Sequence, residues 1–271
     1  MGKLDGQVAF ITGAARGQGR AHAVRLAQDG ADVIAVDICE QLGSVVYPMS
    51  TTEDLDETVR QVKDLGRRIV SYQADVRDAD AMQRAFDDGL AQLGAVTIVV
   101  ANAGIGPGGV AGPDQQWDEV IDVNLKGVWN TGRVAIPSMI ENDRGGSIVL
   151  TSSTGGLIGS PSNVAGMLGY TAAKHGVIGL MRSWANYLAP HNIRVNSVAP
   201  TTVRTPMANN GDLSMITKYA PELANALTNA MPVEAVEAID VANAVAWLVS
   251  DESRYVTGTV LAVDAGNLNR R

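Results

Sequence analysis

The chain has 271 residues, of which 46% are hydrophobic and 4% aromatic, and this composition suits one sizeable core with a buried sheet and alanine-rich helices. Its formal net charge of −8 argues against a protein that binds nucleic acid through the phosphate backbone, because such proteins need a basic surface. The single cysteine, Cys39, excludes an internal disulfide framework and fits a reducing compartment, so we expect a cytoplasmic protein.

The sequence predicts neither a targeting segment nor a metal site. Residues 1–6 contain no long apolar run, and no stretch of about 18 uninterrupted apolar residues occurs, so we expect no signal peptide and no membrane span. The three histidines, His22, His175 and His191, lack the spacing of metal ligands. Helical packing or surface exposure is the expected role of His22 and His175.

Strand-like apolar runs alternate with helical segments along the chain. The expected strands cover residues 8–11, 32–36, 68–74, 97–101, 147–152, 193–199 and 260–263. The expected helices cover residues 20–27, 53–65, 78–93, 116–140, 170–188 and 241–249. This alternation predicts an α/β fold in which residues 1–271 form a single domain, a Rossmann-type doubly wound parallel sheet with helices on both faces. Ligands of such sheets bind beyond the carboxyl ends of the strands.

Three stretches interrupt the alternation. Residues 38–52 add length between the second strand and the next helix. Residues 155–169 are rich in Gly, Ser and Pro, which predicts a loop. Residues 206–232 form a second excursion that contains several Met and Leu side chains, which suit an irregular apolar pocket or ordinary helix packing.

A glycine-rich turn follows the first expected strand and precedes a helix. It runs from Thr12 to Gly19 with the spacing G-x-x-x-G-x-G. Glycines let the backbone approach a pyrophosphate, and the N-terminus of the helix offers free N–H groups and the positive end of its dipole. A tight turn from strand to helix without a ligand is the alternative interpretation.

Asp37 ends the second expected strand. An acid roughly 20 residues beyond the glycines binds the 2′-hydroxyl of the adenosine ribose in NAD. Asp37 would repel the 2′-phosphate of NADP, whereas Arg16 in the glycine turn could accept it. We expect NAD, because the carboxylate competes directly with the phosphate; NADP and a merely solvated aspartate are the alternatives.

Tyr170 and Lys174 lie four residues apart in an expected helix, so they share one helix face. A free tyrosine titrates near about 10 and is a poor base at neutral pH. A nearby ammonium stabilises the phenolate, so Lys174 is expected to lower the Tyr170 pKa and make the phenol a usable proton donor and acceptor. A tyrosine and a lysine without a joint role are the alternative.

Together these motifs resemble the short-chain dehydrogenase/reductase family, and the resemblance covers nearly the whole chain. Residues 122–125 resemble the segment that carries the catalytic asparagine, here Asn124, and residues 150–153 resemble the strand end that carries the catalytic serine. We align Ser153 to that serine, with Ser152 as the alternative. The resemblance implies that Tyr170 exchanges the substrate proton, while Ser153 binds the substrate oxygen. It also implies that Lys174 binds the nicotinamide ribose and that Asn124 holds a water linking Lys174 to solvent.

The same resemblance assigns residues to the cofactor. Residues 101–104 look like the family's N-N-A-G turn with the first Asn replaced, and Asp75 looks like the acid that caps the adenine pocket. Thr205 stands where the family binds the carboxamide, and Pro200-Thr201 departs from the family's Pro-Gly. The full expected set is Gly13, Arg16, Gly17, Gln18, Gly19, Asp37, Asp75, Val76, Asn102, Ala103, Gly104, Tyr170, Lys174, Pro200, Val203 and Thr205.

A closer resemblance is to the carveol-dehydrogenase-like, mycofactocin-associated branch. It rests on Gly17-Gln18-Gly19-Arg20 and on the 38–52 insertion. In that branch the insertion is thought to fold over the cofactor and retain it, so that an external electron acceptor reoxidises it. A surface insertion, which proteins tolerate at low cost, is the alternative. The family resemblance makes residues 206–232 the substrate lid.

The expected function is NAD-dependent hydride transfer between a secondary alcohol and its ketone, with a small, apolar, terpenoid-like substrate. The alternatives are an NADPH-linked ketone reductase with an exchangeable cofactor and a non-catalytic, NAD-binding redox sensor. A serine hydrolase is disfavoured because the G-x-S-x-G elbow is absent around Ser153. The family also implies a homotetramer assembled through the helices at 116–140 and 170–188, with no nucleic-acid or membrane partner.

Overall fold

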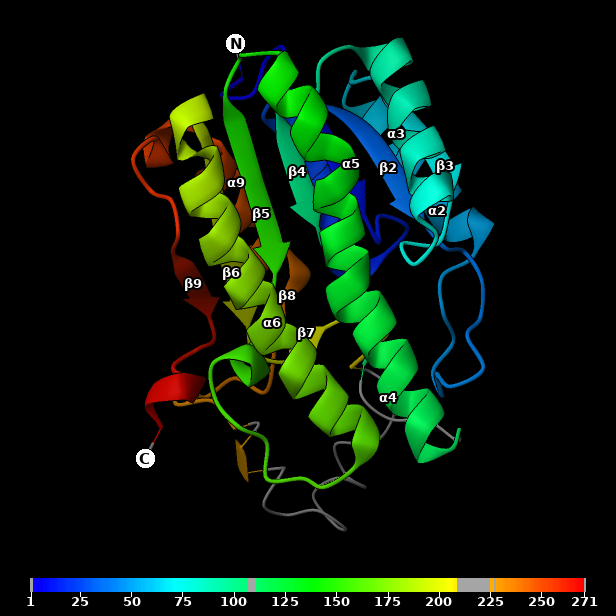
Figure 1. Ribbon diagram of the computed structural model, residues 1–271, viewed down its shortest axis with the longest axis vertical. Coiled ribbons are helices and arrows are strands. Elements are labelled where there is room, and N and C mark those ends of the chain that lie inside the picture. The colour runs from blue at the N-terminus through cyan, green and yellow to red at the C-terminus, as the bar shows by residue number, and fades with distance from the viewer. Residues whose placement is uncertain (1, 107–110, 209–224, 227, 271) are drawn as a thin grey trace.

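The computed structural model describes residues 2–106, 111–208, 225–226 and 228–270. A seven-stranded parallel sheet with the strand order β3-β2-β1-β4-β5-β6-β9 runs through the molecule (Figure 1). Its strands are β1 (Val8–Thr12), β2 (Asp32–Asp37), β3 (Ile69–Gln73), β4 (Ile98–Ala101), β5 (Gly146–Thr151), β6 (Ile193–Pro200) and β9 (Val260–Val263). The predicted Rossmann-type α/β fold is therefore confirmed.

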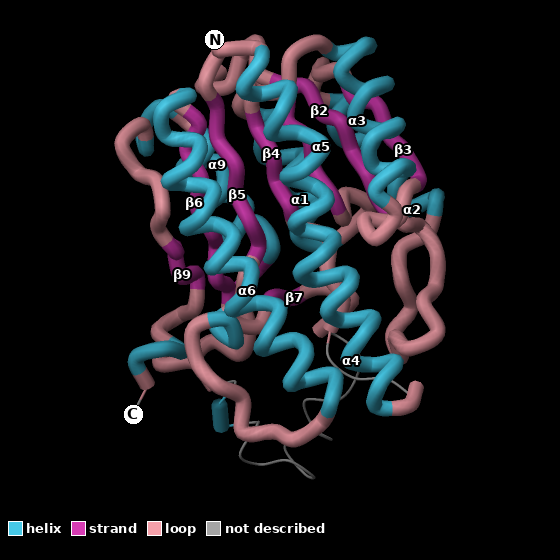
Figure 2. The backbone as a smooth tube through the Cα atoms, in the orientation of Figure 1, coloured by secondary structure: helices cyan, strands magenta, loops and turns pink. Residues whose placement is uncertain are grey.

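Helices cover both faces of this sheet. Those of the described chain are α1 (Gly17–Gln28), α2 (Thr52–Asp64), α3 (Ala79–Leu93), α4 (Pro113–Ile121), α5 (Gly127–Glu141), α6 (Ala165–Leu188) and α9 (Ala238–Val249). Helices α4, α5 and α6 lie on the near face in Figure 2. Helix α1 packs between α2 and α9 on the opposite face.

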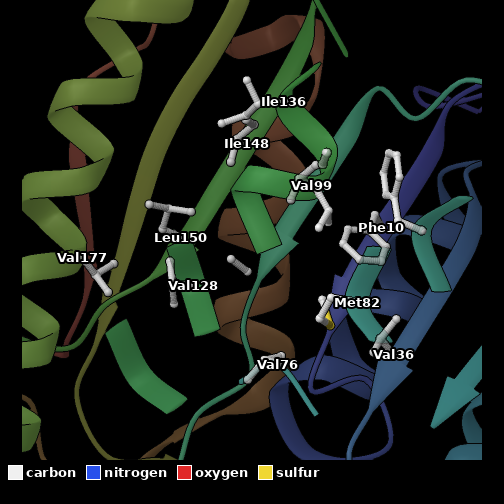
Figure 3. Packing of buried hydrophobic residues seen from close by; sticks show 14 of the residues in the cluster. Phe10, Val36, Val76, Met82, Val99, Val128, Ile136, Ile148, Leu150 and Val177 are labelled. Atoms are coloured by element: carbon white, nitrogen blue, oxygen red, sulfur yellow. The ribbon is translucent and has the colours of Figure 1, made fainter. Parts of the chain in front are cut away.

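Each face of the sheet carries its own buried core, because successive side chains of a strand point to opposite sides. On β1, Phe10 joins the core under α3, α5 and α6, whereas Ile11 joins the core under α1 and α9. Figure 3 shows the first core, where Phe10, Met82, Ile148 and Val177 come from four different elements. Such strands, buried on both faces, have the continuous apolar runs seen in the sequence.

The helix expected at 116–140 is not continuous. It is divided into α4 and α5 by a π-helical turn, Asp122–Lys126. One extra residue per turn there shifts the hydrogen-bond ladder from i+4 to i+5, and such turns cluster at functional sites. Apolar periodicity does not reveal so local a change.

The loop expected at 155–169 is shorter in the structure. Helix α6 begins at Ala165, five residues before Tyr170, and a 3₁₀ turn occupies Thr154–Gly156. Gly169 is helical because α6 lies close to α4: a Cβ added there would be 3.4 Å from Cε3 of Trp117. From sequence alone, the glycines of this stretch indicate a loop. At Gly169 the glycine instead allows α6 to pack closely against α4.

Two very short strands were not predicted. β7 (Val203–Arg204) and β8 (Val236–Glu237) form a separate parallel pair beside the carboxyl edge of the main sheet. Of the expected lid, 206–232, residues 209–224 and 227 lie outside the described residues. Within the described chain, no helix combines the length and apolarity needed to cross a membrane.

Candidate active site

A pocket opens beyond the carboxyl ends of β1, β2, β3 and β4, next to the point where the strand order reverses. This is the place where doubly wound sheets bind their ligands. The expected cofactor residues that line it are Gly13, Arg16, Gly17, Gln18, Gly19, Asp37, Asp75, Val76, Asn102, Ala103, Gly104 and Thr205. Tyr170, Lys174, Pro200 and Val203 lie outside its lining.

The glycine turn has the geometry of a phosphate cradle. Gly13 and Gly17 have positive φ angles of +67° and +56°, which side chains other than glycine rarely adopt. A Cβ on Gly19 would lie 1.8 Å from the carbonyl oxygen of Gly13. Arg16 is the N-cap residue of α1, but within the described chain its side chain forms no capping hydrogen bond. The first backbone N–H groups of α1 are therefore not occupied by a capping side chain. These features fit a bound pyrophosphate at the start of the helix.

Asp37 is held at the pocket edge by three donors. Its Oδ2 accepts from the N–H of Ala15 at 2.9 Å, and its Oδ1 accepts from the Ser50 hydroxyl at 2.5 Å and from the N–H of Cys39 at 3.2 Å. Asp37 is buried and lines the pocket. Ser50 was missed by the sequence analysis, because nothing in its local pattern predicts a contact 13 residues away.

The turn after β4 is tied to the glycine turn. The Asn102 amide donates to the carbonyl oxygens of Thr12 at 3.1 Å and Gly13 at 3.3 Å, and the Thr12 hydroxyl accepts from the N–H groups of Asn102 and Ala103. Thr12 was not predicted as a site residue, although its place at the end of β1 is a usable signal.

His22 lies fully buried in α1, and burial lowers its pKa to about 4, so the imidazole is neutral at pH 7.

The acid that follows β3 has its own cation. Asp75 accepts from the backbone N–H and the Nε of Arg77, both at 2.8 Å, and forms an ion pair with its Nη2 at 2.6 Å. The next carbonyl, that of Val76, accepts from the Asn130 amide of α5 at 2.8 Å. Arg77 was not among the predicted residues, but it fixes the carboxylate beside the pocket.

The predicted tyrosine and lysine share one face of α6. Lys174 Nζ lies 5.6 Å from the centroid of the Tyr170 ring and donates to the Thr151 carbonyl at 2.8 Å. Lys174 is buried, and burial lowers its pKa to about 8. Burial raises the pKa of Tyr170, and the hydrogen bond with Ser153 only opposes this rise. The expected lowering of the Tyr170 pKa is therefore wrong for the protein by itself, since desolvation of the phenolate dominates.

The two candidate serines have different partners. Ser153 accepts from the N–H of Gly155 at 3.1 Å and lies beside Tyr170, since a Cβ added to Gly155 would be 3.6 Å from both Ser153 Oγ and Tyr170 Cε1. Ser152 is buried and donates to the carbonyl oxygen of Lys174 at 2.9 Å, which ties β5 to α6. The geometry thus brings Ser153, rather than Ser152, to the phenol.

Asn124 lies in the π-helical turn and is fully buried. Its amide group pairs with the backbone of Ile105, accepting from the N–H at 2.8 Å and donating to the carbonyl at 2.9 Å. Gly104 separates Asn124 from Lys174, because a Cβ added to it would lie 3.1 Å from Asn124 Oδ1 and 3.7 Å from Lys174 Nζ. The four expected catalytic residues therefore gather next to the pocket.

The 38–52 insertion forms one wall of the pocket and is the blue loop beside α4 in Figure 1. Its side chains Leu42 and Tyr47 are buried and line the pocket. The Tyr47 hydroxyl accepts from the N–H of Gly106 at 2.8 Å, and the Ser44 hydroxyl is hydrogen-bonded to Glu119 of α4. The insertion therefore packs against the rest of the chain through buried side chains and hydrogen bonds, which a solvated surface loop would not do.

The remaining predicted residues lie at the end of β6 and beyond it. Pro200 and Val203 are buried, and the Thr205 hydroxyl donates to the Val203 carbonyl at 3.3 Å. Gly17 faces Thr205, since a Cβ added to Gly17 would lie 3.3 Å from Thr205 Cγ2. Among the described residues, no group of three or more His, Cys, Asp or Glu side chains could hold a metal ion.

Comparison with known proteins agrees with this geometry. A family model described as enoyl-(acyl carrier protein) reductase matches residues 13–267. An uncharacterized oxidoreductase of Mycobacterium tuberculosis is 58% identical over 269 residues, which span 99% of this chain and 98% of that protein. The (-)-trans-carveol dehydrogenase of Rhodococcus erythropolis is 48% identical over 277 residues, which span 98% of this chain and 99% of that protein.

One solved structure is similar to this chain over its whole length. The crystal structure of carveol dehydrogenase from Mycobacterium avium in complex with NAD has a TM-score of 0.92 and 50% identity, covering 100% of both chains. The fold and the pocket thus define an α/β oxidoreductase of the dinucleotide-binding class. The chain belongs to the short-chain dehydrogenase/reductase family. The predicted family and the likeness to carveol dehydrogenases are both confirmed.

Proposed function

We propose that this protein is a cytoplasmic, NAD-dependent dehydrogenase that interconverts a small, apolar secondary alcohol and its ketone. The observation that carries this proposal is the grouping of Ser153, Tyr170, Lys174 and Asn124 beside a pocket whose edge is held by Asp37. The similar proteins support it, since one is a carveol dehydrogenase by name and another was crystallised with NAD. A terpenoid-like substrate is the finer part of the proposal.

The proposed chemistry divides between the cofactor and the chain. NAD, when bound, supplies the hydride acceptor, and the protein supplies orientation and proton transfer. The Tyr170 phenolate takes the proton of the alcohol, or the Tyr170 hydroxyl gives its proton to the ketone oxygen, and the Ser153 hydroxyl beside the phenol holds that oxygen. Because burial raises the Tyr170 pKa, the phenol is a ready donor to a ketone, and alcohol oxidation should accelerate with rising pH.

Lys174 is proposed to bind the nicotinamide ribose and to stabilise the phenolate through its positive charge. Its ammonium is directed at the Thr151 carbonyl, next to Gly104. The amide of Asn124 is already paired with Ile105. As the family resemblance implies, Asn124 is proposed to hold a water that links Lys174 to solvent.

The cofactor is proposed to lie across the carboxyl edge, with its pyrophosphate at the glycine turn and its adenosine ribose on Asp37. The alternative of an NADPH-linked reductase depends on a free Arg16. The guanidinium of Arg16 instead donates to the carbonyl of Pro48, which disfavours that alternative. A non-catalytic sensor is disfavoured because all four expected catalytic residues are present and grouped.

Retention of the cofactor by the insertion is part of the proposal, and it is the property that would place the protein in the mycofactocin-associated branch with an external electron acceptor. Leu42, Tyr47 and Met49 line the pocket. Burying their surface on a dinucleotide would contribute a few kcal/mol at about 25 cal/mol per Å². Each ~1.4 kcal/mol is tenfold in affinity, and such gains usually lower the off-rate.

Mass spectrometry of the supernatant from desalted, denatured protein tests both cofactor identity and retention. We expect NAD(H) at close to one molecule per chain in the intact protein, and its loss when residues 39–50 are deleted. Tyr47→Ala should lower the retained fraction, whereas Val46→Ala, at a side chain that is 60% exposed, should not. A protein that purifies empty and turns over rapidly with added NAD would remove retention but leave the dehydrogenase.

We also propose a homotetramer built through α4, α5 and α6. An open groove on this face is lined by Leu125, Trp129, Gly176, Gly179 and Leu180 among others. Trp129 is 40% exposed, and a Cβ added to Gly179 of α6 would meet nothing within 4 Å, which leaves room there for a second helix. One catalytic and cofactor-binding domain spanning residues 1–271 would form each subunit.

A further inference from the structure

We propose that the 38–52 insertion sets the nucleotide preference of the pocket by engaging Arg16 and Asp37, the two residues with opposite preferences. This inference rests on the proposed dinucleotide site. It adds Ser50 and the Pro48 carbonyl as specificity determinants. Both belong to the insertion, and neither follows from the glycine turn and the strand-end acid that usually decide between NAD and NADP.

Ser50 acts on Asp37. The Ser50 hydroxyl donates to Asp37 Oδ1 at 2.5 Å, beside the N–H of Cys39 at 3.2 Å, while the N–H of Ala15 occupies Oδ2. A carboxylate offers about four acceptor positions, so roughly one stays open for a hydroxyl donor. The three donors also prevent the carboxylate from rotating away from an incoming phosphate. Ser50 and Asp37 are both buried, which reduces the screening of that repulsion.

Pro48 acts on Arg16. The Arg16 guanidinium extends from the glycine turn and donates to the carbonyl oxygen of Pro48, and Arg16 also lines the pocket. A 2′-phosphate would have to compete with this carbonyl for the guanidinium. Arg16 can therefore bind the 2′-phosphate of NADP only if its charge-assisted hydrogen bond to Pro48 breaks. Arg16 therefore holds the insertion in place and does not serve as a binding group for the 2′-phosphate.

The insertion is fixed independently of the nucleotide. The Gln41 side chain donates to the carbonyls of Val45 at 2.9 Å and Tyr47 at 3.3 Å and accepts from the N–H of Met49 at 2.9 Å. Ser44 is hydrogen-bonded to Glu119 of α4. Pro48 and Ser50 therefore have positions set by the fold of the insertion, and they cannot simply follow whichever nucleotide enters.

The test is the ratio of bound NAD⁺ to NADP⁺, measured by native mass spectrometry after prolonged equilibration of the protein with an equimolar mixture. This readout needs no substrate and no turnover. Ser50→Ala should lower the ratio about tenfold, the effect expected for loss of one charge-assisted hydrogen bond. Val46→Ala truncates a side chain of the same insertion that is 60% exposed, and it should leave the ratio unchanged within about twofold.

Arg16 supplies the second arm. In the intact protein, Arg16→Gln should leave the ratio nearly unchanged, because the guanidinium does not serve the phosphate. Deletion of residues 39–50 should raise the bound share of NADP⁺ about tenfold, and Arg16→Gln in that background should reverse the gain; such non-additivity is the signature of coupled residues. If the deletion variant does not fold, the Ser50 and intact-chain Arg16 variants decide alone.

An unchanged ratio in Ser50→Ala would overturn the inference, and so would a tenfold loss of NADP⁺ binding in intact Arg16→Gln. Either result would leave the proposed dehydrogenase standing, since the protein would still bind NAD⁺. Failure of the unaltered protein to bind either nucleotide would instead overturn the proposed function itself.

Discussion

At the scale of single residues, the phenol of Tyr170 is the group on which the proposed chemistry depends. Tyr170→Phe removes only its hydroxyl, so the rate of turnover should fall by about 10²–10⁴, the usual contribution of a positioned acid or base. NAD binding and thermal stability should change little. Steady-state kinetics on a verified secondary alcohol and calorimetric binding measure the two effects.

The matched control is Tyr187→Phe, on the same helix but with a side chain that is 61% exposed. It should retain full turnover. Near-normal turnover in Tyr170→Phe would remove this residue from the mechanism, whereas equal losses in both variants would indicate a general effect on α6.

A pH effect on stability is expected at His22. Burial lowers its pKa to about 4 in the folded protein, while the unfolded chain titrates near 6.5. Between these values the unfolded state binds more protons, so stability is present above pH 6.5 and is lost as the pH falls towards 4. The shift corresponds to about 3 kcal/mol at most. Denaturant unfolding should show this loss in the unaltered protein relative to His22→Gln, and parallel pH profiles would contradict it.

Local sequence explains some site residues and not others. Asp37, Tyr170 and Lys174 could be predicted because short local patterns identify them. Asp37 ends an expected strand, and the other two lie one helix turn apart. Ser50 could not, since its hydroxyl acquires a role only when the insertion folds back against Asp37. The predicted pKa of Tyr170 was wrong for a related reason: the charge on Lys174 is visible in sequence, but the burial of the phenol is not.

At the scale of elements, the glycine turn before α1 is the segment least tolerant of a side chain. Gly19→Ala places a Cβ 1.8 Å from the Gly13 carbonyl oxygen, so the turn must open. We expect a loss of about 1–3 kcal/mol in stability, as for other overpacked sites, together with loss of NAD binding. Chemical denaturation and calorimetric titration measure both.

Gly159→Ala is the control for this substitution, because a Cβ there meets nothing within 4 Å. It should change neither stability nor NAD binding. If Gly19→Ala bound NAD as the unaltered protein does, the glycine turn would not be the phosphate cradle.

The strands were easier to predict than the helices for a physical reason. A strand buried on both faces produces a continuous apolar run, such as residues 98–101, which the sequence displays directly. Helix α6 instead has Gly166 and Gly169 in its first turns, with Gly169 against Trp117 of α4, and these glycines look like a loop. The π-helical turn leaves no mark in the apolar pattern, because it changes hydrogen bonds without changing which face is buried.

At the scale of the whole molecule, the groove over α5 and α6 bears on assembly. Trp129→Glu places a charge among apolar side chains that the proposed tetramer would bury, so the tetramer should dissociate into smaller species. Light scattering at micromolar concentration measures the mass directly. Val46→Glu, an equally drastic change at a residue 60% exposed on the insertion, should leave the mass unchanged. A monomeric unaltered protein would contradict the proposed assembly.

One consequence concerns the chemical durability of the chain. Its single thiol, Cys39, follows Asp37, and burial together with the acids Asp37, Asp54, Asp56 and Glu53 raises its pKa to about 12. Only the thiolate reacts readily with peroxide or alkylating agents, and at pH 8 roughly one thiol in 10⁴ would be ionised. A protein that handles reducing equivalents thus keeps its one sulfhydryl nearly inert, so iodoacetamide should leave Cys39 unmodified until the chain unfolds.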